Sequence, residues 1–167
     1  MNDNLRGRKS RKLLTPPQFS LDELLISPMR LRRVYDEDGE VSYLPLKSNR
    51  RPTGIQIFDD YLMYLTNGGS DLRPFVSRYG IRREDLDSLV FLFTGMRNID
   101  FRLAYRKRVA DEYLRYTDLS MEDVARLSGY GTSFNFFLAY KKAHGMSPLR
   151  YRARIRQKGD LGRYRVD

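Results

Sequence analysis

The sequence predicts a mainly α-helical fold of seven helices, in which two pairs of short helices are joined by one long helix, with a small N-terminal β-hairpin extension. Three observations lead to this prediction. Apolar residues recur at helical spacing from residue 55 onward. Glycines and capping residues interrupt that pattern at intervals that suit helix ends. Before residue 55, Asp38-Gly39 separates two β-rich runs, and this dipeptide is a strong hairpin signal.

The N-terminal residues divide into a basic arm and a short extension. Residues 1–12 carry five basic side chains against one acid and have almost nothing to bury, so we expect this arm to be disordered in isolation. Two functions of this arm stay open: it binds the phosphates or a groove of a nucleic acid, or it only improves solubility. Residues 13–54 form the extension, with a short helical turn capped by Ser20, the hairpin around Asp38-Gly39, and a linker at 47–54.

The helices follow one another with short connections. The helical segments span residues 55–69, 71–80, 83–93, 98–117, 120–130, 132–145 and 147–157. The longest, 98–117, carries one apolar stripe with Phe101 and Tyr105 and a second with Leu103 and Leu114, which predicts packing on both of its sides. Arg106 on this helix is expected to pair with Asp111 or Glu112. Residues 158–167 are left as a basic tail.

Composition narrows the class of partner. The chain has 167 residues, a net charge of +10 and an isoelectric point near 9.9, which indicates an anionic partner: nucleic acid first, an acidic membrane surface second. There are no cysteines, so disulfides and thiol chemistry are excluded. No stretch approaches the roughly 20 apolar residues of a membrane span. We therefore expect a cytoplasmic, nucleoid-associated protein.

Two stretches in the second half carry a family resemblance. "TDLSMEDVARLSGY" and "GYGTSFNFFLAYKKAHGMSPLRYR" resemble the DNA-binding domain of the AraC/XylS family in the spacing of glycine, aromatics, lysine pair, Gly-x-Ser-Pro and Tyr-Arg. The first half is similar by spacing more than by letters. The matching positions there are Gly80, Ile81, Leu86, Leu89, Gly95, Phe101, Arg106 and Ala110. The resemblance covers residues 55–157.

The resemblance implies a bilobed domain that places two recognition helices in successive major-groove segments of double-stranded DNA, normally to regulate transcription. In the second recognition helix it points to Thr132, Ser133 and Asn135 as base-side residues. The basic cluster that follows supplies candidates for phosphate contact, which are Lys141, Lys142, Arg150 and Arg152.

The sequence departs from the family where bases should be read. The base-facing positions of the second pair also include Phe134, Phe137 and Leu138, and those of the first pair fall on Glu84, Asp87 and Ser88. A further apolar run includes Phe91 and Leu92 and cannot all point inward on a helix. Two explanations stay open: residues 13–58 cover these side chains, or a protein partner or a second copy does. The second explanation gives the alternative function, a protein-interaction module on a repurposed helix-turn-helix scaffold.

Nothing in the sequence favours catalysis. His144 is the only histidine, which leaves no His-based triad and no multi-histidine metal site. We expect no catalytic residues, no cofactor and no metal. The first 54 residues are too few for an effector-binding domain, so the sequence also predicts no small-molecule effector, and no membrane partner is expected.

Overall fold

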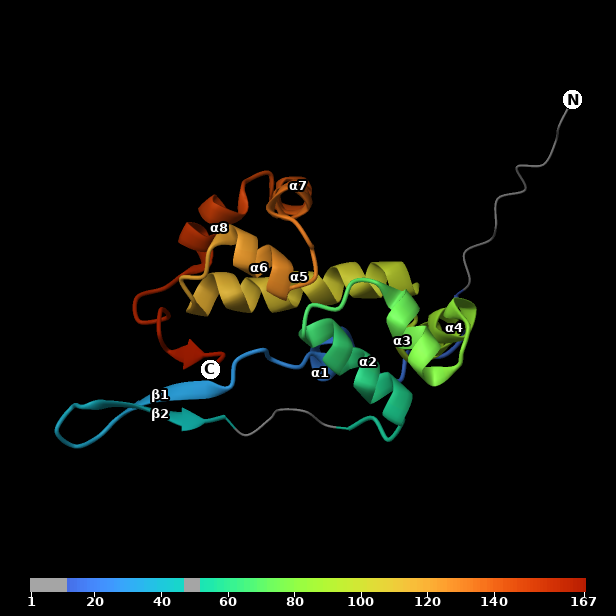
Figure 1. The fold of residues 1–167 in the computed structure, drawn as a ribbon, viewed down its shortest axis with the longest axis horizontal. Coiled ribbons are helices and arrows are strands. Elements are labelled where there is room, and N and C mark those ends of the chain that lie inside the picture. Colours follow the sequence, from blue (N-terminus) through green and yellow to red (C-terminus); the bar gives the residue numbers. More distant parts are fainter. Residues whose placement is uncertain (1–11, 47–51) are drawn as a thin grey trace, which may run out of the picture.

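The computed structural model describes residues 12–46 and 52–167 (Figure 1). All seven predicted helices are present as α2 to α8. Their bounds are Gln56–Thr66 (α2), Leu72–Tyr79 (α3), Arg83–Thr94 (α4), Asn98–Tyr116 (α5), Met121–Leu127 (α6), Ser133–His144 (α7) and Pro148–Ile155 (α8). The expected turn at Ser20 is a four-residue helix, α1 (Leu21–Leu24). The basic arm lies outside the described residues except for Lys12, and so does most of the predicted linker.

The hairpin forms where Asp38-Gly39 predicts it. β1 (Leu31–Tyr35) pairs antiparallel with β2 (Val41–Pro45), and Gly39 takes a positive φ of 82° in the turn between them. A third strand, β3 (Tyr164–Arg165), adds to the other edge of β1 and gives the order β2-β1-β3. The sequence did not predict β3. Part of the predicted basic tail is thus a structural element that joins the end of the chain to its N-terminal extension.

The long helix α5 is the centre of the molecule. Phe101, Tyr105 and Leu114 are fully buried in one continuous core, as the two predicted stripes require. Leu103 is an exception, because 50% of it is exposed, so the second stripe is shorter than predicted. Helices α2 and α4 pack on α5 as one lobe, with α3 against both of them, while α6 and α8 pack on it as a second lobe that also holds α7 (Figure 1).

The two lobes also meet at a pair of glycines. Gly68 follows α2 and Gly129 follows α6, with φ values of 81° and 83°. A Cβ atom on Gly68 would lie 2.7 Å from the Leu127 carbonyl oxygen, and one on Gly129 would lie 3.2 Å from the Gly68 carbonyl oxygen. Because these are backbone atoms, a side chain at either position would push the two turns apart. The close approach of the lobes therefore depends on glycine at both positions.

Candidate nucleic-acid interface

Helix α7 is anchored through one face and open on the other. Its first turn is capped by the Thr132 hydroxyl, which accepts a hydrogen bond from the Asn135 N–H at 3.2 Å. Phe136 and Tyr140 are buried, as their spacing of four predicts, with ring centroids 4.7 Å apart. The Tyr140 hydroxyl donates to Asp111 at 2.7 Å, which ties α7 to α5. The anchored face fixes which side of α7 points away from the protein.

The predicted base-side residues lie at the exposed start of α7. Thr132, Ser133 and Asn135 are all exposed to solvent. The Asn135 amide nitrogen donates weakly to the Tyr130 carbonyl at 3.5 Å, so its side chain is partly engaged. The Ser133 hydroxyl makes no hydrogen bond within the described residues. The structure brings the three side chains together at the N-terminal end of one helix.

The apolar residues of this face are bare. The exposed fractions of Phe134, Phe137 and Leu138 are 66%, 42% and 48%. The hairpin does not cover them: in Figure 1 it lies on the other side of α5 from α7. The expectation that residues 13–58 cover these three side chains is therefore wrong.

The apolar run of α4 is divided. Leu92 is 62% exposed, and Phe91 is half-buried. Phe93 is covered by two rings: its centroid lies 6.0 Å from that of Phe19 in the extension and 5.1 Å from that of Phe58 in α2. The Phe19 N–H also donates to the Phe93 carbonyl at 3.0 Å. The extension thus covers one residue of this run and leaves Leu92 open.

The base-facing positions of α4 are not equivalent. Glu84 and Ser88 are exposed and share a face with Leu92, four residues further on. Asp87 instead accepts a hydrogen bond from the Asn98 amide at 2.8 Å, and Asn98 accepts one from the buried Tyr61 hydroxyl at 2.6 Å. These two hydrogen bonds link α4 to α5 and α2, so Asp87 has a structural role.

The basic residues of the second lobe divide in the same way. Lys141, Lys142 and Arg150 are exposed. Arg152 is half-buried and donates to the Leu119 carbonyl at 2.7 Å, and burial lowers the pKa of its guanidinium. Sequence reasoning had no signal for this difference, because alternate arginines along α8 look alike until their surroundings are known.

Arg156 also binds the protein itself. Its guanidinium donates to the carbonyls of Leu114, Arg115 and Thr117 at the C-terminal end of α5, and it pairs with Asp118 at 2.8 Å. A cation at this end of a helix satisfies carbonyls that have no partner within the helix. Arg156 therefore fastens α8 to the end of α5.

The prediction that Arg106 pairs with Asp111 or Glu112 is wrong. Asp111 pairs with Lys107 at 2.7 Å and accepts from Tyr140, while Glu112 accepts a hydrogen bond from Ser27. Burial lowers the pKa of Arg106, and the hydroxyls of Tyr61, Tyr64 and Tyr130 lie close enough to oppose that effect. Arg106 is thus a half-buried cation between the lobes and not part of the exposed basic surface.

Comparison with known proteins supports a helix-turn-helix domain in this chain. Residues 76–154 match a family described as a helix-turn-helix domain. The C-terminal domain of AraT, a response regulator from Geobacillus stearothermophilus, superposes with a TM-score of 0.53 at 23% identity, over 62% of this chain and 86% of that chain. The DNA-binding domain of AdpA, a global transcriptional factor crystallised with a target DNA, gives 0.50 at 22% identity, over 59% and 88%.

A protein of unknown function from Listeria innocua gives a TM-score of 0.51 at 28% identity, over 64% of this chain and all of the other. No curated protein sequence matches the chain. The family match shows that residues 76–154 are similar to a helix-turn-helix domain, and the solved structures show that the chain shares the fold of these DNA-binding domains. The predicted resemblance is confirmed. In the part of the chain that the structure describes, no helix is long and apolar enough to cross a membrane.

Proposed function

We propose that the protein is a cytoplasmic, DNA-binding transcriptional regulator that places α4 and α7 in successive major-groove segments. The observation that carries this proposal is the open face of α7, which begins with Thr132, Ser133 and Asn135 and ends at Lys141 and Lys142. Polar side chains at the start of a helix suit base edges, and lysines near its end suit phosphates. The AdpA domain, crystallised with its target DNA, has the same fold.

Base specificity is modest in this proposal. Only a few side chains of α7 hold hydrogen-bonding groups toward the open side, and Asp87 of α4 is engaged within the protein. Phe134 and Leu138 contribute apolar contacts, for which the thymine methyl group is the suitable partner. Lys141, Lys142 and Arg150 supply phosphate contacts, whereas Arg152 serves the packing of α8.

A charge-removal experiment tests this assignment. The double substitution Lys141→Gln and Lys142→Gln is expected to weaken duplex binding about equally for all sequences and to reduce the slope of log K against log salt by about 2. The control is Arg32→Gln with Lys158→Gln, two exposed cations outside α7. Fluorescence anisotropy with a labelled duplex measures both variants. Equal loss in the two would show that α7 does not face the DNA.

A second candidate function rests on the bare apolar face of α7. Exposed apolar side chains that lie together usually mark a contact with another protein. Here Phe134 and Leu138 share one side of α7, four residues apart, and Phe137 lies beside them. In this alternative the helix-turn-helix scaffold holds a self-association surface in place of a base-reading one.

Sedimentation velocity distinguishes the alternative. If α7 mediates self-association, the wild-type chain is a dimer at micromolar concentration, and Phe134→Asp with Leu138→Asp makes it a monomer with an unchanged circular dichroism spectrum. The matched control is Leu149→Asp with Leu161→Asp, which also replaces two exposed leucines, neither of them in α7. A wild-type chain that stays monomeric without DNA rules this candidate out.

A further inference from the structure

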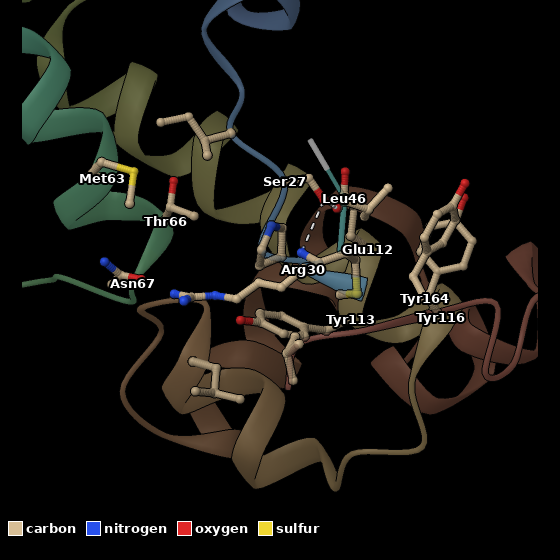
Figure 2. Close-up of a pocket in the computed structure, with 15 residues that line it drawn as sticks. Ser27, Arg30, Leu46, Met63, Thr66, Asn67, Glu112, Tyr113, Tyr116 and Tyr164 are labelled. Atoms are coloured by element: carbon tan, nitrogen blue, oxygen red, sulfur yellow. Dashed lines mark hydrogen bonds between the residues drawn. The ribbon is translucent and has the colours of Figure 1, made fainter. Parts of the chain in front are cut away.

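A cleft lies between the N-terminal extension and the helical domain. Its volume is about 780 Å³, and it is lined by residues 26–30, α2, α5, Leu127 of α6 and the β3 end of the chain (Figure 2). In Figure 1 this region lies across α5 from α7. A volume of roughly 300–1,000 Å³ is usual for small-molecule sites. The cleft is therefore large enough for an organic ligand and separate from the proposed DNA-facing side.

Much of the cleft wall is apolar. Met29 and Met63 approach it from the extension and from α2, and Leu46, Leu127 and Val166 complete this surface. Methionines suit ligand surfaces because their side chains are flexible and polarisable. This wall offers contacts to a hydrocarbon or aromatic body.

Unpaired hydrogen-bond donors lie at one side of the cleft. Arg30, Asn67 and Tyr113 line it, and none of their side chains has a hydrogen-bond partner within residues 12–46 and 52–167. Figure 2 shows the Arg30 side chain extending toward the side where Asn67 and the Tyr113 hydroxyl lie. Burial raises the pKa of Tyr113, so its hydroxyl stays protonated and able to donate near neutral pH. These groups together suit an anionic oxygen.

Among the described residues that line the cleft, the one carboxylate is already engaged. Glu112 accepts a hydrogen bond from the Ser27 hydroxyl, and the positive charge of Arg108 acts on it. Arg108 itself pairs with Asp22 at 2.8 Å. The charge that lacks a counterion in the cleft is therefore that of Arg30.

We propose that this cleft binds a small hydrophobic carboxylate. The carboxylate pairs with Arg30 and accepts hydrogen bonds from Asn67 and Tyr113, while the apolar body packs on Met29 and Met63. A guanidinium and a carboxylate form strong, charge-assisted hydrogen bonds. This proposal replaces the sequence-based prediction of no small-molecule effector. The ligand would touch α2, α5 and α6, and thus both lobes at once.

Methyl NMR of the full chain tests the proposal, with 4-phenylbutyrate as the anionic probe and 4-phenylbutan-1-ol as its neutral analogue. Titration with the acid is expected to shift the methyl signals of Met29 and Met63 and to leave those of Met96, Met121 and Met146 in place. The acid is expected to bind about tenfold more tightly than the alcohol, as one charge-assisted pair allows.

Arg30→Gln is the decisive variant, since Arg30 is exposed and makes no side-chain contact on which the fold depends. It is expected to reduce the preference for the acid to about one, whereas the control Arg83→Gln keeps it. Three results would overturn the proposal: no shift at Met29 and Met63 with millimolar probe, shifts at every methionine, or an unchanged preference in Arg30→Gln. The test contains no DNA, so it stands apart from the proposed function.

Discussion

At the scale of single residues, the same residue type serves opposite purposes in this protein. Lys142 and Arg150 are exposed to solvent, whereas the half-buried Arg152 and Arg156 donate to backbone carbonyls inside the second lobe. Asp87 occupies a position where the family faces DNA, and it binds Asn98 instead. Spacing along the chain predicts the helix face on which a side chain lies. It does not predict which residue of another element contacts that side chain in the folded protein.

Glu112 gives a pH-dependent prediction at this scale. Burial is the main cause that raises its pKa above the ordinary value of about 4.3 for glutamate. A raised pKa in the folded state means that ionisation costs stability, with a cost that is absent below the unfolded value and complete above the folded one. Glu112→Gln should therefore gain stability relative to the wild type as the pH rises from about 4 to 7.

Thermal unfolding across this pH range measures the difference. The glutamine carbonyl still accepts from Ser27, so the hydrogen bond is retained. Glu37→Gln, at an exposed position of the hairpin turn, serves as the control and should show no such trend. A difference between Glu112→Gln and the wild type that stays constant with pH would contradict the prediction.

At the scale of elements, the helices were predictable and the small sheet was only half predictable. Apolar spacing and glycine or serine caps mark each of α2 to α8, and Asp38-Gly39 marks the hairpin. β3 has two residues, too few for any periodicity to appear. Its position depends on contacts with residues far away in the sequence, among them the pairing of Asp160 with Arg115 of α5 at 2.8 Å.

Asp160 should control the docking of β3. It is 3% exposed and also accepts a hydrogen bond from the Gln157 N–H at 2.9 Å. Asp160→Ala removes both contacts and leaves Arg115 without its partner, which should cost about 1–3 kcal/mol of unfolding free energy. Hydrogen exchange should then accelerate at the Arg30 and Arg33 amides, which donate to the carbonyls of Arg165 and Arg163.

The comparison for that measurement is Asp118→Ala. Asp118 is largely exposed, and its partner Arg156 keeps three carbonyl acceptors without it. The exchange rates at Arg30 and Arg33 should therefore stay as in the wild type. Unchanged rates in Asp160→Ala would show that Asp160 does not control the docking of β3.

At the scale of the whole molecule, the two sides of α5 differ in chemistry. α7 lies on one side of α5 and the sheet on the other (Figure 1). The α7 side has a polar start, an apolar middle and terminal lysines, whereas the cleft is lined from the extension and the β3 end of the chain. The sequence predicted the helical domain and the residues of the open face of α7. It did not predict the cleft, because residues 26–30, 63–67, 112–116 and 164–166 meet there only through the tertiary fold.

The central claim is that this basic protein, with a net charge of +10, binds duplex DNA through phosphate contacts and α7. Fluorescence anisotropy of a labelled mixed-sequence duplex, titrated with the full chain between about 50 and 200 mM salt, tests it most directly. The expected result is binding at low salt that weakens linearly on a log–log plot, with a slope of about −0.9 for each phosphate contacted. No duplex binding at about 50 mM salt, where such contacts are strong, would contradict the claim.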